Sequence, residues 1–183
     1  MAGRKLFFVV LSVLLAGVMV LGLNFEVSIS QAAVDGIAEL GLETPINGRV
    51  FVIVTKESAS EPRLQVDVRG VPFWGKDVFA MTSEDIVVIA GDDQSVIGYP
   101  IELSELPAGE YYVQAFVTVY TTFNRADGHT VLMHDDTGDG QRLWRSIGNA
   151  YSIPKKVYLD TAKPGWVDLK ITKIGRASCR ERV

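Results

Sequence analysis

The feature that most constrains this chain is the absence of a helical repeat between Arg49 and Lys173. No segment there shows a sustained 3.6-residue spacing of apolar side chains, whereas short runs of β-branched and aromatic residues recur between Gly, Pro, Asp and Asn. Such runs are typical of β-strands, and the intervening residues are typical of turns. Seven strands are predicted: Arg49–Thr55, Leu64–Val68, Ile86–Ala90, Glu110–Tyr120, His129–Met133, Lys155–Leu159 and Trp166–Thr172.

Many short strands separated by turns predict an all-β fold. The expected architecture is an immunoglobulin-like antiparallel β-sandwich, with a closed barrel as the alternative. Pro107-Ala108-Gly109 predicts a turn that feeds the longest strand. Asp127-Gly128 predicts a hairpin turn, across which Arg125 and Asp127 are placed to pair.

The N-terminus has the pattern of an export signal. Arg4 and Lys5 precede an uncharged apolar run of 18 residues, Leu6 to Leu23, and a small-residue site ends at Ala32. This predicts a signal peptide at residues 1–32, cleaved after Ala32, then a linker or short helix at 33–48 and the β-sandwich at 49–173. An uncleaved membrane anchor is the alternative because the run is borderline for a span. Either arrangement predicts a secreted or periplasmic domain.

The last ten residues, 174–183, match the translation of a common sequencing adapter and are predicted to be an artefact. The natural protein is then expected to continue beyond Lys173. The single cysteine, Cys179, lies in this tail, so the predicted domain contains no disulfide and no thiolate metal site.

Charge narrows the range of partners. The chain carries 18 basic and 22 acidic residues; between Ala33 and Lys173, 13 basic and 20 acidic residues remain, a net charge of −7. An acidic surface disfavours nucleic acid and anionic membrane, because both are bound mainly by clustered Lys and Arg. No nucleic-acid partner is expected, and a membrane contact is expected only if the N-terminal segment stays uncleaved.

No residue pattern predicts catalysis within this chain. The only histidines, His129 and His134, are expected on opposite faces of one strand, so a shared metal site would require the chain to bend between them. The alternative for His129 is a bond to a nearby turn carboxylate. A Gly-x-Ser-x-Gly elbow, which exposes the nucleophile of many serine hydrolases, is not present in the sequence. No catalytic residue and no organic cofactor are therefore predicted.

Calcium is the one metal for which the sequence offers ligands. Asp135, Thr137 and Asp139 would occupy the first, third and fifth places of a calcium loop, with Gly140 at the sixth. The closing glutamate is missing, because the twelfth place is Ser146. A solvated acidic turn is therefore the competing interpretation.

Aromatic residues offer a second possible ligand surface. Four of them could form an exposed platform for a carbohydrate, although aromatic side chains in a cysteine-free domain are more often part of the core. The four are Phe73, Trp74, Trp144 and Tyr151.

Four sequence blocks carry a resemblance to a known family: Gly70–Gly75, Leu106–Ala115, Val119–Val131 and Arg145–Ser152. They resemble the N-terminal module of secreted bacterial esterases, larger proteins in which an α/β-hydrolase domain follows the module. The resemblance covers most of Arg49 to Asp160 and implies a non-catalytic accessory domain whose partner is the downstream hydrolase. No catalytic residue carries over, because the matching region lies upstream of the family's catalytic serine. The alternatives are a stand-alone secreted binding or adhesion module, for carbohydrate or calcium, and a structural envelope protein.

Overall fold

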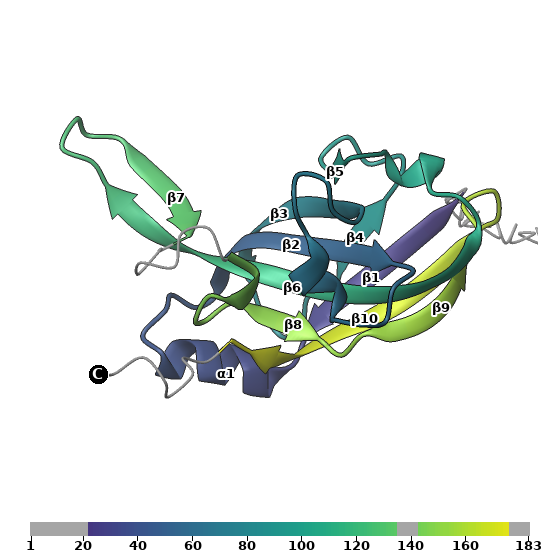
Figure 1. Cartoon of the computed structure of the whole chain (residues 1–183). Helices are drawn as coiled ribbons and strands as arrows, with labels where there is room; N and C mark the ends of the chain where they lie inside the picture. Colours follow the sequence, from purple (N-terminus) through teal and green to yellow (C-terminus); the bar gives the residue numbers. More distant parts are fainter. Residues whose placement is uncertain (1–21, 135–142, 176–183) are drawn as a thin grey trace, which may run out of the picture.

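The computed structural model describes residues 22–134 and 143–175, which form a strand-rich domain with one short α-helix (Figure 1). The strands are β1 Leu23–Ile29, β2 Ile46–Thr55, β3 Phe73–Met81, β4 Val87–Ala90, β5 Ile97–Tyr99, β6 Gly109–Asn124, β7 Thr130–His134, β8 Ala150–Ser152, β9 Lys155–Leu159 and β10 Gly165–Ile174. The helix is α1 Gln31–Glu39, and three 3₁₀ helices are η1 Pro62–Gln65, η2 Leu103–Glu105 and η3 Leu143–Arg145.

The strands form a mixed sheet that curls into a half-barrel. Its main path runs β4-β1-β10-β8-β6-β2-β3-β5, and the long β6 also pairs with β7 and β9. The all-β class is confirmed. The immunoglobulin-like antiparallel sandwich is not confirmed, because the strands make one curled sheet in which β1 runs parallel to β10, with Leu23 opposite Gly165 and Ile29 opposite Ile171.

The curl brings strands that are distant in the sheet order together around one core. Phe25 of β1 stacks on Trp74 of β3, with ring centroids 6.5 Å apart, and both side chains are fully buried. The indole Nε1 of Trp74 donates a hydrogen bond to the carbonyl of Ile101 at 3.0 Å, which satisfies the only polar atom of that ring. Inward side chains of the curled sheet therefore pack on each other rather than on a second sheet.

Burial explains why some strands were easy to predict and others were not. β10 alternates exposed and buried residues from Trp166 to Ile171, as expected for a strand with one buried face. β2 is instead buried on both faces from Val50 to Thr55, and its sequence is a continuous apolar run. The outer face of β2 must therefore be covered by other parts of the chain.

The N-terminal boundary predicted from the sequence cuts through this domain. Phe25, Val27 and Ile29 of β1 are at most 1% exposed, and β1 lies between β4 and β10. α1 follows directly, with the Ser30 hydroxyl accepting a hydrogen bond from the Ala33 amide at 3.2 Å as an N-cap. Cleavage after Ala32 would remove β1 and the beginning of the helix.

The predicted linker at residues 33–48 is likewise part of the domain. It contains most of α1, whose Ala33 and Ile37 are buried, and the start of β2. α1 packs closely on the end of β10, because a Cβ atom at Gly36 would lie 2.4 Å from the side chain of Ile174. Ile174, the first residue of the predicted adapter segment, thus ends β10, while residues 176–183 lie outside the described part of the chain.

The strand predicted at Leu64–Val68 is wrong. Leu64 and Gln65 belong to η1, which begins at Pro62 and is closed by a hydrogen bond from the Leu64 amide to the Glu61 carbonyl at 2.9 Å, and no strand follows through Val68. Proline lacks the amide that a central strand needs and favours the first position of a helical turn.

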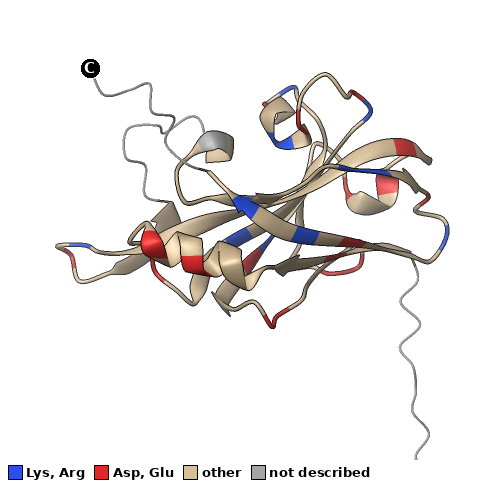
Figure 2. Cartoon of the chain, turned by 90° about the horizontal axis from the view of Figure 1, so that it is seen from below, with Lys and Arg blue, Asp and Glu red and all other residues tan. Residues whose placement is uncertain are grey.

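Charged residues of both signs are distributed over the described domain. Figure 2 shows acidic positions on α1 and basic positions on neighbouring strands. Within residues 22–134 and 143–175, the helical segments are too short or too polar to cross a membrane.

Candidate functional site

The outer face of β2 and β6 is covered by two segments, residues 56–72 and the η3 region. Phe51 and Phe116 project from the sheet, and Trp144 of η3 lies over them, with ring centroids 5.3 and 4.9 Å away. Phe73 joins the same cluster at 5.9 Å from Trp144. These contacts form a second, smaller hydrophobic cluster on the outside of the half-barrel.

This cluster decides between the two interpretations of the four aromatic residues. Trp74 is fully buried in the main core, on the opposite side of β3 from Phe73. Phe73, Trp144 and Tyr151 are partly buried against the outer cluster. The four side chains therefore do not form one platform, and the core interpretation is confirmed for Trp74.

Beside the outer cluster lies a polar network built on Gln114, which is fully buried on β6. The Gln114 side-chain oxygen accepts a hydrogen bond from the Arg63 amide at 3.0 Å. Its Nε2 donates to the Ser152 carbonyl at 2.8 Å and to Glu61 Oε2 at 2.9 Å. Every polar atom of a buried amide is thus used, which fastens residues 61–63 to the sheet.

Arg63 completes the network. Its Nε donates to Glu61 Oε2 at 2.8 Å, another of its nitrogens donates to the Trp144 carbonyl, and its guanidinium lies 3.8 Å from the centre of the Tyr151 ring. A guanidinium over an aromatic face is attracted by the ring's negative potential. Arg63 therefore joins η1, η3 and β8.

The carboxyl group of Glu61 is held in its charged form. Partial burial by itself raises the pKa of Glu61, but the hydrogen bonds from Gln114 and Arg63, together with the positive charge of Arg63, outweigh it and the pKa is lowered. Both hydrogen bonds use Oε2, and no described residue donates a hydrogen bond to Oε1.

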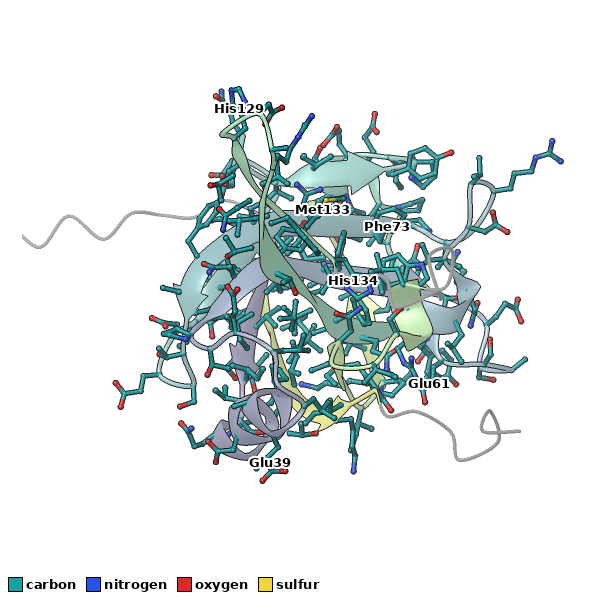
Figure 3. The ribbon with its side chains drawn as sticks, turned by 90° about the vertical axis from the view of Figure 1, so that its left-hand side faces the viewer. Glu39, Glu61, Phe73, His129, Met133 and His134 are labelled. Carbon is teal, nitrogen blue, oxygen red and sulfur yellow. The ribbon has the colours of Figure 1, made fainter. Side chains whose placement is uncertain are left out.

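A groove opens next to Glu61. It has a volume of about 280 Å³ and is lined by Ser58, Ser60, Glu61, Pro62, Tyr112 and Pro154. Tyr112 comes from β6 and Pro154 from the connection between β8 and β9, so the groove lies where the 56–62 segment crosses the sheet. Figure 3 shows Glu61 on the lower part of the domain, well away from the tip of the β6–β7 hairpin.

The structure does not bring the two histidines together. His129 lies at the exposed tip of the β6–β7 hairpin, with Nδ1 3.3 Å from an Asp127 carboxylate oxygen, as the turn-carboxylate alternative predicted. His134 lies at the other end of β7, where Nδ1 is 3.4 Å from the Val119 carbonyl (Figure 3). The hairpin turn itself is confirmed, with Gly128 at φ 85° and Arg125 paired to Asp127 at 3.0 Å.

The predicted calcium ligands Asp135, Thr137 and Asp139 lie outside the described residues, so the calcium loop stays a prediction. Within residues 22–134 and 143–175, no group of three or more His, Cys, Asp or Glu side chains is placed to hold a metal ion.

The β6–β7 hairpin projects beyond the rest of the sheet (Figure 1). Cross-strand partners Phe123–Val131 and Thr121–Met133 share one face of this hairpin, because side chains of paired residues point the same way. Met133 is 53% exposed and Phe123 is 37% exposed. This face of the hairpin thus carries three partly exposed apolar side chains, Phe123, Val131 and Met133, beside Thr121.

Sequence reasoning missed Glu61, Arg63 and Gln114. One signal was available: Gln114 interrupts an otherwise apolar stretch of a long strand, and a buried amide in such a place needs partners. Its partners are about fifty residues away along the chain, which no local pattern reveals.

Comparisons with protein families, with curated proteins and with solved structures gave no match for this chain.

Proposed function

We propose that this chain is the non-catalytic N-terminal accessory domain of a longer exported hydrolase of the esterase type. The four sequence blocks that resemble such modules support this proposal. The observation that carries it is the partly exposed apolar group Phe123, Val131 and Met133 on the β6–β7 hairpin, since exposed apolar surface on a projecting element is typical of a docking site.

The occupant of this face is the domain that follows in the chain. Lys173, the last residue before the predicted adapter segment, pairs with Tyr151 of β8, and the side chain of Asn149, just before β8, accepts a hydrogen bond from the Val119 amide at 2.8 Å. Val119 directly precedes the β6 residues that pair with β7. A segment continuing from Lys173 therefore starts near the base of the hairpin.

The first test is the gene sequence beyond the codon for Lys173, read without adapters. The proposal expects an open reading frame that continues into an α/β pattern containing Gly-x-Ser-x-Gly. A stop codon shortly after Lys173 would overturn it and favour a stand-alone binding module.

The second test uses the full-length protein encoded by that gene. Replacing Met133 by Glu places a charge in the docked face and is expected to separate one cooperative thermal transition into two. Phe79→Glu is the matched control, because Phe79 is 70% exposed on β3 and lies outside the hairpin. Two variants with the same single transition as the parent would refute docking at the hairpin.

A further inference from the structure

The groove beside Glu61 has features of a ligand site that the accessory-domain proposal does not use. Its volume of about 280 Å³ lies just below the range of about 300–1,000 Å³ typical of pockets for drug-sized ligands. A single small ring fits such a space better than an extended chain does. The groove also combines apolar and polar lining groups in a small area.

Residues 56–61 form one wall of the groove, and hydrogen bonds from Gln65 and Thr55 hold this segment in place. The Gln65 side chain accepts a hydrogen bond from the Thr55 hydroxyl at 2.8 Å and donates to the carbonyls of Glu57 at 3.3 Å and Ser60 at 2.7 Å. The Glu57 amide donates to the same Thr55 hydroxyl at 3.0 Å. These bonds set the loop conformation before any ligand arrives, which lowers the entropy lost on binding.

The polar groups at the surface of the groove are free to bind. Glu61 is fixed through Oε2, so its Oε1 can accept hydrogen bonds from a ligand. Among the described residues, the hydroxyls of Ser58, Ser60 and Tyr112 have no hydrogen-bond partner. The site therefore offers one strong acceptor and three hydroxyls that can donate or accept.

The remaining lining groups are apolar and flat. Pro62 is buried beneath the groove, and the Tyr112 ring and Pro154 border it. The charge of Glu61 is balanced by Arg63 at 2.8 Å, so the site has little net attraction for a cation. A charge-neutral ligand with many hydroxyls and one apolar face matches this combination.

We propose that this groove binds one ring of a neutral carbohydrate, with sugar hydroxyls donating to Glu61 Oε1 and the apolar ring face packing on Tyr112. Gln114 and Arg63 act as positioning residues, because they hold the carboxylate at the edge of the groove without touching the ligand. This proposal does not depend on the accessory-domain proposal.

The test is saturation-transfer difference NMR on the purified full chain, with the methyl glycosides of glucose, galactose, mannose and N-acetylglucosamine as probes. At least one glycoside is expected to bind with a millimolar Kd. Glu61→Gln keeps an acceptor for Gln114 and is expected to weaken binding by about tenfold or more, as for a lost hydrogen bond to a charged group. Glu57→Gln is the matched control in the same loop, with no expected effect.

Tyr112→Phe keeps the ring and removes only the hydroxyl, so it tests the site even if the Glu61 variant disturbs the loop. It is expected to weaken the same glycoside while the thermal midpoint stays unchanged. The proposal is overturned if no glycoside binds, or if the parent, Glu61→Gln and Tyr112→Phe bind alike. Glu61-dependent binding of ethylammonium in place of the glycosides would also overturn it and assign the groove to a cation.

Discussion

Removing residues 1–32, as cleavage after Ala32 would do, is expected to unfold the domain. β1 is paired on both sides, with β10 and β4, and its Phe25, Val27 and Ile29 lie in the main core. A chain that starts at Gly22 keeps these contacts and is expected to fold normally. The two truncations differ only in β1, Ser30 and the first residues of α1.

The size of the effect follows from burial. Fully burying a Val, Ile or Phe side chain contributes about 1.5–3 kcal/mol, so the three inward side chains of β1 together contribute about 5–9 kcal/mol. Domains of this size have a free energy of unfolding of about 5–15 kcal/mol. The loss therefore consumes most or all of the net stability, before the exposed edges of β4 and β10 are considered.

Urea unfolding followed by circular dichroism measures this difference. The chain from Gly22 is expected to show a cooperative transition, and the chain from Ala33 is expected to lack one. N-terminal sequencing of exported protein is expected to give a start at or before Leu23. Equal urea midpoints for the two truncations, or a folded exported form that begins at Ala33, would show that β1 is dispensable and that the reasoning is wrong.

Three further changes test the fold at separate points. Trp74→Ala removes the ring that stacks on Phe25 and is expected to lower the free energy of unfolding by about 3–5 kcal/mol in urea titrations. A loss below about 1 kcal/mol would contradict the position of Trp74 at the centre of the main core. Hydrogen bonds from Lys76 and Ser95 lower the pKa of Asp93 from 3.8 to about 2. The charged Asp93 carboxylate therefore adds to the free energy of unfolding in full above pH 3.8, and this contribution is lost as the pH falls towards 2. Between pH 3.8 and 2, the urea midpoint of the parent should fall more steeply than that of Asp93→Asn. Parallel plots of urea midpoint against pH for the two proteins would refute a stabilising role of the Asp93 charge. Gly48→Ala places a Cβ atom 2.1 Å from the Thr118 carbonyl oxygen and should reduce the thermal midpoint clearly more than Gly165→Ala in β10, whose Cβ would meet only the Leu23 side chain at 3.7 Å; equal midpoints for the two variants would refute the close approach.

The strands that the sequence predicted are those whose burial repeats locally. β9 was predicted with the observed bounds, and β10 was recognisable because alternate residues face the core. β6 was evident from its length and its β-branched and aromatic content, and the hairpin turn after it was predicted, although its extension from Tyr120 to Asn124 was not.

The elements that were missed depend on long-range contacts. β1 merges with the apolar run of the predicted export signal, so composition alone assigned it to the wrong segment. β3 lacks a clean alternation because Gly75 lies in it, under the Phe51 ring at 2.7 Å from where its Cβ would be. The Glu61 groove depends on Gln114, whose partners come from residues far away in sequence.

The parallel pairing of β1 with β10 joins the first and last described strands, and this order has a consequence for when the domain can fold. During synthesis, the N-terminal strand remains without its principal neighbour until almost the whole domain has been made. Pairings between distant residues form slowly, because a large loop must close before they stabilise the chain. The complete sheet can therefore form only after β10 has been synthesised, whereas β2, β3 and β6 can pair earlier.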